Sequence, residues 1–195
     1  MKRTFLSLPL LAGLAIAAAQ PAIANQPAAI PMANAIYAPI TQAEVEAAQR
    51  AWGDALVAIA TEYDKKGKDA ATQLAGQVID SAYGYNMGPV LFKPTLAAPP
   101  TTFRTTRDGA LSYFVGGNPS FPDDSGFALK GWRSYKIDNA AILITGNSAI
   151  SMGNVSITDS RGNVTVVDKT WGYVRDAEGK LRIVLHHSSL PYTPK

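Results

Sequence analysis

The sequence predicts one α+β domain in which N-terminal helices pack against a strongly curved antiparallel sheet. Apolar residues recur every three or four positions between residue 41 and about residue 84, which indicates helices. From Gly131 onward, runs rich in β-branched residues alternate with turn signals, which indicates consecutive hairpins. Helices followed by consecutive strands are typical of an α+β fold, whereas parallel α/β folds alternate the two.

The first 24 residues read as a secretory signal peptide. Lys2 and Arg3 form a basic start, residues 5–19 are apolar, and Ala22-Ile23-Ala24 is a small-x-small cleavage site. About 15 apolar residues are short for a membrane span, which needs about 20, although a retained anchor is the alternative. We therefore expect a periplasmic or secreted protein.

The remaining chain divides into an arm and a domain. Residues 25–40 are rich in alanine and proline and predict an arm or linker. Residues 41–195 are expected to form the folded domain, and their number suits one hydrophobic core.

Composition excludes several classes of partner and chemistry. The formal net charge of +3 includes Lys2 and Arg3, so the chain without its signal carries +1. We expect no nucleic-acid partner, and no membrane partner after signal removal. The chain has no cysteine, which excludes disulfides, thiolate zinc sites and cysteine nucleophiles.

Two helices are expected at the start of the domain. Thr41 and Glu44 form a capping box for the first, and the Lys65–Lys68 run with its glycine ends it. Its apolar face comprises Val45, Ala48, Trp52, Leu56, Ile59 and Tyr63. Asp69 is predicted to cap a second helix that ends near Gly84.

The middle of the chain predicts short elements. Residues 89–93 and 103–106 resemble short strands. Asp108-Gly109 marks a turn or a helix start, and residues 110–115 fit a short helix closed by Gly116-Gly117.

The C-terminal part predicts a meander of five strands. We expect strands at residues 132–137, 140–145, 149–158, 164–175 and 181–187. The turns fall at 138–139, 146–147, 160–163 and 176–179.

The last predicted strand ends with the only two histidines, His186 and His187, followed by Ser188 and Ser189. Because strand side chains alternate between faces, His186 and Ser188 share one face, about 7 Å apart along the strand. This pattern fits either a site or the polar, solvated end of an edge strand.

The sequence lacks the residues that several common types of catalytic site require. A catalytic zinc usually needs three ligands, and two adjacent strand histidines point apart; one histidine with several carboxylates stays open. No G-x-S-x-G sequence is present, which disfavours a serine hydrolase. What remains is a pocket of neutral polar groups, for which Thr95 and Tyr113 are candidates; their alternatives are a turn threonine and a core tyrosine.

Three stretches carry a family resemblance. They are YGYNMGPVLFKPTLA at 83–97, FRTTRDGALSYFVGG at 103–117 and RIVLHHSSLPY at 182–192. They resemble the iota-class carbonic anhydrases, which are related to the association domain of calcium/calmodulin-dependent kinase II. The resemblance covers about residues 41–192. It implies a cone-shaped fold like nuclear transport factor 2 (NTF2) and a homodimer.

The resemblance also implies the activity and the site. The activity is the reversible hydration of carbon dioxide to bicarbonate and a proton, and we expect no metal or other cofactor. The implied catalytic residues are Thr95, Tyr113, His186 and Ser188. The three hydroxyls would hold water and bicarbonate, and His186 would accept or relay the proton. The apolar side chains expected to bind carbon dioxide are Leu91, Phe92 and Phe114.

Two other functions stay open because one fold hosts many functions. One is a non-catalytic oligomerisation module of the NTF2 type, which has no need of the four polar residues together. The other is a small-molecule isomerase or cyclase of the ketosteroid isomerase or polyketide cyclase kind. That class usually uses a carboxylate base, and the proposed pocket contains none. We expect surface roles for Lys93 and Arg104.

Overall fold

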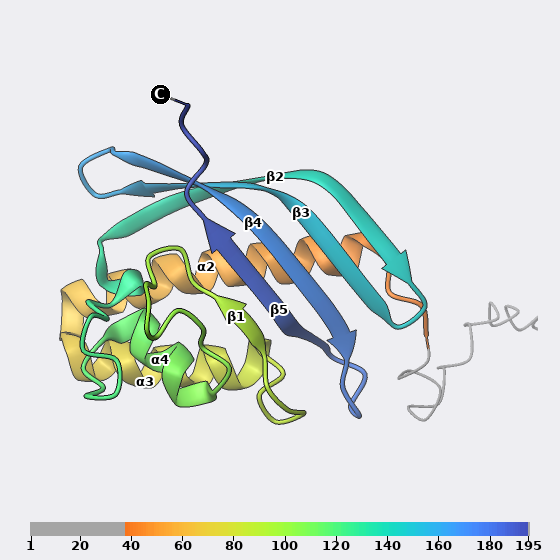
Figure 1. Ribbon diagram of the computed structural model, residues 1–195, viewed down its shortest axis with the longest axis horizontal. Helices are drawn as coiled ribbons and strands as arrows, with labels where there is room; N and C mark the ends of the chain where they lie inside the picture. Colours follow the sequence, from red (N-terminus) through yellow and green to blue (C-terminus); the bar gives the residue numbers. More distant parts are fainter. Residues whose placement is uncertain (1–37, 195) are drawn as a thin grey trace, which may run out of the picture.

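The computed structural model describes residues 38–194, so the predicted signal peptide and residues 25–37 of the predicted arm lie outside the described residues. Two helices, a short strand and a third helix precede four long strands, and the sheet bends around the helices (Figure 1). None of the helices in the described part is long and apolar enough to cross a membrane. The architecture is the predicted α+β fold, in which helices pack against a curved, mainly antiparallel sheet.

The predicted capping box opens α2 (Gln42–Lys66). The Thr41 hydroxyl accepts a hydrogen bond from the Glu44 amide at 3.3 Å, and the Glu44 carboxylate accepts one from the Thr41 amide at 2.8 Å. Gly67 ends the helix with φ +84°, a conformation that glycine adopts without strain.

Helix α3 (Lys68–Ala82) begins directly after Gly67. The prediction that Asp69 caps it is wrong, because Gly67 ends α2 and starts α3, which puts Asp69 inside the first turn. Helix α4 (Arg107–Val115) starts at the predicted Asp-Gly signal, and the Thr106 hydroxyl accepts the Gly109 amide at 3.2 Å.

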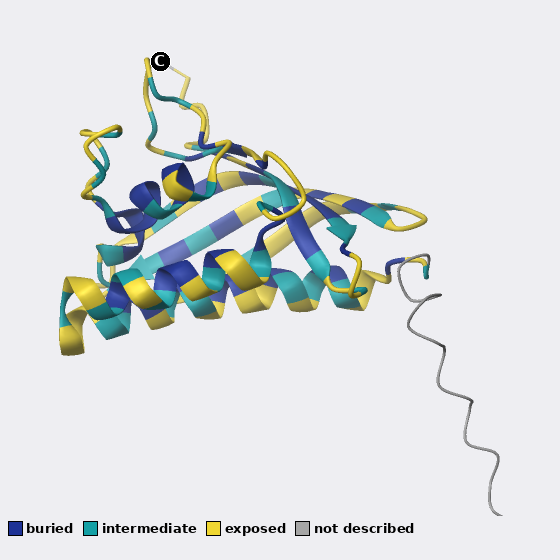
Figure 2. Cartoon of the chain, turned by 90° about the horizontal axis from the view of Figure 1, so that it is seen from below, coloured by how far each residue is buried: buried dark blue, intermediate teal, exposed yellow. Residues whose placement is uncertain are grey.

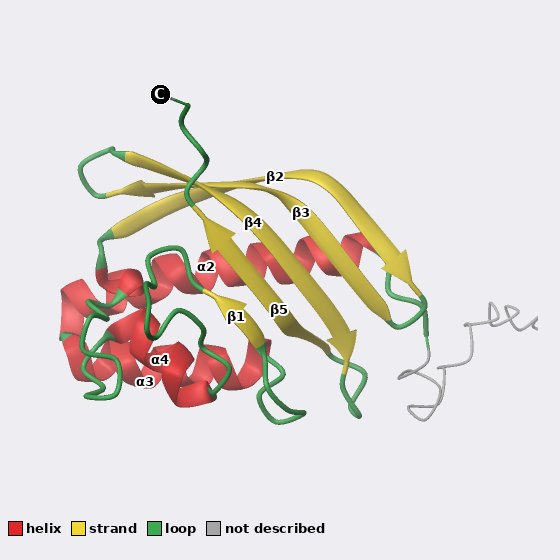
Figure 3. Cartoon of the chain, viewed as in Figure 1, coloured by secondary structure: helices red, strands yellow, loops and turns green. Residues whose placement is uncertain are grey.

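The sheet has the strand order β1-β5-β4-β3-β2 (Figure 3). The strands are β1 (Leu91–Lys93), β2 (Trp132–Thr145), β3 (Ser148–Asp159), β4 (Val164–Arg175) and β5 (Leu181–Ser189). Strands β2 to β5 form the predicted antiparallel meander, whereas β1 pairs with β5 in parallel. Strand β5 is therefore an inner strand, and the edge-strand interpretation of its polar end is wrong.

The predicted turn at Asp138-Asn139 is wrong, because β2 runs through these residues with a shift in register. The neighbouring strand places Gly153 there, and a Cβ on Gly153 would lie 2.1 Å from the Asp138 carbonyl oxygen. The glycine thus allows the strand to bulge and bend where a hairpin was expected.

The short strand predicted at residues 103–106 is also absent, since this segment makes a single backbone contact to β1. In that contact the Arg104 amide donates to the Phe92 carbonyl at 2.8 Å. A short 3-10 helix, η1 (Phe127–Leu129), lies between α4 and β2.

The core lies between the helices and one face of the sheet, which we call the inner face (Figure 2). Helix α2 contributes Val45, Trp52, Leu56 and Ile59 from its predicted apolar stripe. The other face, which we call the outer face, carries several exposed apolar side chains. The inner face of β1, β4 and β5 is where the predicted site residues gather.

Candidate active site

The end of β5 places one histidine and one serine in the core. His186 and Ser188 are 2% and 1% exposed on the inner face, whereas His187 is exposed. In the strand register His186 lies beside Phe92 of β1 and Trp171 of β4. The alternation expected from the sequence therefore selects the pair that enters the core.

Both nitrogens of the His186 ring have partners. Nδ1 lies 2.8 Å from the Tyr83 hydroxyl, and Nε2 lies 2.8 Å from Nζ of Lys169. Tyr83 is held in turn by Trp52, whose Nε1 donates to the Tyr83 oxygen at 3.1 Å. The Phe92 ring stacks on the imidazole with centroids 4.4 Å apart. The imidazole is thus fixed on its edges and on one flat side.

Electrostatics keep this imidazole neutral. Burial, together with the nearby Lys169 and His187, holds the pKa of His186 well below its ordinary value. A neutral imidazole with both nitrogens engaged has no free lone pair for a water molecule. This geometry argues against His186 as a direct proton acceptor and leaves it a positioning or relay role.

Two hydroxyls meet beside the histidine. Thr95, which follows Pro94 after β1, places its Oγ1 2.5 Å from Oγ of Ser188. Nζ of Lys93 donates a hydrogen bond to the Ser188 carbonyl at 3.0 Å. The serine is therefore held through both its main chain and its side chain.

Tyr113 brings a third hydroxyl from α4. Its ring is buried, and its hydroxyl has no hydrogen-bond partner of normal geometry within residues 38–194. Burial raises the pKa of Tyr113 above its ordinary value, although Leu96 and Thr95 lie close enough to oppose that rise. A buried hydroxyl without a partner is rare, and it is well placed to bind a ligand.

These groups line one narrow, closely packed hollow. Its polar lining consists of Thr95, Tyr113, Lys169, His186 and Ser188. Its apolar lining consists of Trp52, Phe92, Pro94, Phe114 and Phe127. The structure thus brings together the four predicted polar residues and two of the three predicted apolar ones.

Leu91 is the predicted residue that the structure does not bring to the hollow. It is 62% exposed on the outer face, where it lines a separate groove with Phe103 and His187. The physical reason is strand alternation, because Phe92 points inward and its neighbour must point outward.

Sequence reasoning missed Lys169, Tyr83 and the role of Trp52. A signal for Lys169 was present, since it alternates with the buried Val167 and Trp171 along β4. A lysine in the inward-facing series of a strand is unusual enough to mark a site. Tyr83 gave no such signal, because nothing local in the sequence connects the end of α3 with β5.

Lys169 is 4% exposed and lies deep in the hollow. Burial lowers the pKa of its ammonium to about 7. Its Nζ lies 4.5 Å from the centre of the Trp52 ring and 5.4 Å from that of Trp171, distances at which a cation is attracted to the ring face.

The surface role expected for Arg104 is wrong. Its guanidinium is buried and pairs with Asp124 at 2.8 Å, and the same carboxylate accepts from the Ser112 hydroxyl at 2.7 Å. This pair holds the loop before η1 against α4, so Arg104 has a structural role in the core.

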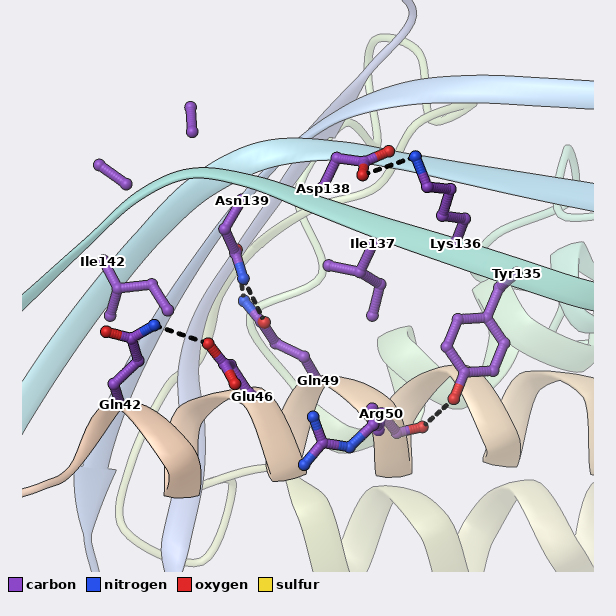
Figure 4. A pocket seen from close by; sticks show the side chains of 12 residues that line it. Gln42, Glu46, Gln49, Arg50, Tyr135, Lys136, Ile137, Asp138, Asn139 and Ile142 are labelled. Atoms are coloured by element: carbon purple, nitrogen blue, oxygen red, sulfur yellow. Dashed lines mark hydrogen bonds and ion pairs between the residues drawn. The ribbon is translucent and has the colours of Figure 1, made fainter.

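A wider groove of about 690 Å³ lies between α2 and β2 (Figure 4). Gln49 crosses it to Asn139 through two hydrogen bonds of 2.9 and 2.8 Å and also donates to Ser151. The polar groups of this groove thus bind one another. Among the described residues no group of three or more histidine, cysteine or acidic side chains could hold a metal ion.

The fold and the hollow define a class, an α+β domain whose narrow pocket is lined by polar and aromatic side chains and suits a very small ligand. The comparison with known families then identifies it: residues 43–190 match the metal-independent carbonic anhydrase family, and the chain belongs to that family.

Two relatives are closely similar. A metal-independent carbonic anhydrase from Nostoc sp. strain PCC 7120 is 58% identical over 193 residues, which cover 96% of this chain and 94% of the relative. The crystal structure of an iota-carbonic anhydrase from a cyanobacterium, complexed with bicarbonate, is 65% identical. It matches with a TM-score of 0.79 over 80% of this chain and 95% of that one.

Proposed function

We propose that this protein catalyses the reversible hydration of carbon dioxide to bicarbonate and a proton. The observation that carries the proposal is the unpartnered Tyr113 hydroxyl, buried beside the Thr95–Ser188 pair. Together these groups offer hydrogen bonds to a small molecule rich in oxygen. Family membership and the bicarbonate complex of a 65% identical protein support the same chemistry.

The residues divide the task by chemistry. The hydroxyls of Thr95, Tyr113 and Ser188 hold the attacking water and the oxygens of bicarbonate. The rings of Phe92 and Phe114 form the apolar wall against which carbon dioxide, an apolar molecule, binds. His186 is too well engaged to touch the reacting water and therefore orients its neighbours.

Replacing Ser188 by alanine tests the proposal. We expect the rate of carbon dioxide hydration, measured by stopped flow, to fall roughly 100-fold, as for loss of one preorganised hydrogen-bonding group. The matched control is Ser189→Ala on the next residue of β5, which points away from the hollow and leaves the rate unchanged. A Ser188→Ala protein as active as the unmodified one contradicts the proposed site.

Metal independence has its own test. After exhaustive dialysis against a chelator, we expect the hydration rate to persist, in keeping with the family. A rate that disappears and returns on addition of Zn²⁺ contradicts this part of the proposal.

We also propose that two copies associate through the outer face. Leu143, Ile150, Gly172, Leu185 and Leu91 are neighbours in strand register and form an apolar row across all five strands. Leu143 and Leu91 are 64% and 62% exposed, which is unfavourable for a surface in water. We expect sedimentation to show a dimer that Leu143→Asp weakens; a monomeric unmodified protein contradicts the proposal.

Finally, we propose that residues 1–24 direct export to the periplasm or outside the cell. The basic start, the apolar run and the small-x-small site support it. Mass spectrometry of the exported protein should find a chain that begins near Asn25, whereas full-length protein in the cytoplasm contradicts export.

A further inference from the structure

Lys169 is buried without a counter-ion. Its side chain lies at the bottom of the hollow, and no carboxylate lies within ion-pair distance of it in residues 38–194. Asp168, the preceding residue, is exposed on the other face and pairs with Asn154. An ammonium in such a position is unstable unless it loses its proton or gains an anion.

The groups that face Lys169 are mostly neutral. They are His186 on β5, Tyr113 on α4 and the rings of Trp52 on α2 and Trp171 on β4. On β1, Lys93 donates to the Ser188 carbonyl and lines a separate groove. No group facing Lys169 within the described part of the chain is negatively charged, so the lysine is either neutral or, when protonated, balanced by an anionic ligand.

The register places Lys169 against the reacting groups. Lys169 of β4 lies directly opposite Ser188 of β5, and both side chains point inward. Side chains in such pairs have Cβ atoms about 5 Å apart. The hydroxyl that meets Thr95 therefore lies beside the lysine side chain.

The hydrogen bond to His186 leaves one side of the amine free. A charged Lys169 can only donate, so Nε2 of His186 then accepts its hydrogen bond. The proton of the neutral imidazole is then on Nδ1, which donates to the Tyr83 oxygen. The same oxygen also accepts a hydrogen bond from Nε1 of Trp52. A neutral amine keeps two N–H groups and can make the same bond. Two positions on Nζ remain in both states: two N–H groups on the ammonium, or one N–H and the lone pair on the neutral amine.

From this geometry we infer that Lys169 is a further catalytic residue, whose amine takes up the proton released during hydration and then binds bicarbonate as the ammonium. The inference rests on the proposed function. As water oxygen bonds to the carbon of carbon dioxide, one C=O electron pair moves onto oxygen and one water proton moves to Nζ. A neutral pair, carbon dioxide and amine, becomes bicarbonate and ammonium, so the buried hollow keeps zero net charge.

Lys169→Met and Lys169→Arg separate the two roles. Methionine removes both the base and the charge, so we expect hydration to fall at least about 100-fold and bicarbonate affinity, measured by calorimetry, at least about 10-fold. Arginine stays protonated, so hydration falls similarly while bicarbonate affinity stays within about 3-fold. The matched control is Lys136→Met on exposed β2, which leaves both unchanged. Lys169→Met with unmodified turnover and binding overturns the inference.

The pH dependence of the hydration rate distinguishes a catalytic Lys169 from a purely structural one, because a structural lysine would not change it. Hydration by the unmodified protein should decline as pH falls through about 7, where Lys169 gains its proton, and Lys169→Met should lose this dependence. A profile identical in the two proteins overturns the inference.

A binding experiment separates this inference from the proposed function. In protein labelled with ¹³C at lysine Cε, the resonance that Lys169→Met removes should titrate well below the other lysines, and bicarbonate should raise its pKa. That result stands even if the unmodified protein shows no turnover, which would overturn only the proposed function. A Lys169 resonance that ignores bicarbonate overturns the inference by itself.

Discussion

Arg104 and Lys169 are both buried cations, but only Arg104 has a carboxylate partner among the described residues. Asp124 lies 2.8 Å from the Arg104 guanidinium, whereas Lys169 meets an imidazole and two indole rings. Arg182 resembles Arg104, since it pairs with Asp176 at 2.5 Å. The paired arginines join loops to helices and strands. The unpaired lysine lines the hollow, where a carboxylate would compete with bicarbonate.

The largest effect on stability should follow from breaking the paired region. Asp124→Ala leaves Arg104 charged and buried without an anion, which is expected to cost about 3–5 kcal/mol of unfolding free energy. Urea unfolding measures this loss. The control is Asp108→Ala, an exposed carboxylate 3.7 Å from Arg107, which should change stability by less than about 1 kcal/mol. Equal losses of unfolding free energy in the two variants would contradict a special role for the buried Arg104–Asp124 pair.

Lys169→Met should stabilise the protein, whereas Asp124→Ala should destabilise it. Removing a buried, unpaired ammonium is expected to raise the unfolding free energy at pH 7 by about 2 kcal/mol. The folded pKa of Lys169 is lowered to about 7 from 10.5, so the unmodified protein gains stability as pH rises from about 7 to about 10.5. The advantage of Lys169→Met should shrink across that window.

Unfolding measured at pH 7 and pH 10 checks this prediction. A Lys169→Met protein that is less stable than the unmodified one at pH 7 would show that the lysine is a structural group. A more stable but less active variant is the pattern expected of a functional residue.

A smaller effect should appear on the acid side for the second paired arginine. Burial raises the pKa of Asp176, but hydrogen bonds from Arg182 and from the Lys180 and Glu178 amides outweigh it, so the pKa is lowered overall. The stability from this carboxylate is present above pH 4 and is lost as pH falls through the folded pKa. We expect Asp176→Asn to lose less stability than the unmodified protein between pH 5 and pH 2, by roughly 1–2 kcal/mol. Parallel acid profiles would contradict this.

The smallest effect is expected for an exposed cation. Lys136 pairs with Asp138 at 2.8 Å on the surface, with both side chains more than half exposed. Lys136→Met should change the unfolding free energy by no more than about 0.5 kcal/mol, because solvent screens such pairs. A change in unfolding free energy as large as that of Lys169→Met would mean that burial does not explain the difference between the two lysines.

The sequence by itself determined the features that depend on local pattern. The Thr41 capping box, the apolar stripe of α2, the strands β3 to β5 and the inward direction of His186 and Ser188 depend on residues a few positions apart. Helix and strand periods fix which side chains share a face, so these predictions needed no knowledge of the partner. Thr95 and Tyr113 came from the family resemblance, because nothing local connects them to β5.

Only the tertiary structure decided what meets across the chain. It replaced the predicted turn at residues 138–139 by a bulge opposite Gly153, and it added β1 beside β5, so that Phe92 reaches the histidine. It also placed Lys169 and Tyr83 on the two nitrogens of His186, from positions 17 and 103 residues away. Hydrogen bonds and desolvation act through space, so the charge of Lys169 becomes significant only once the fold has buried it without an anion.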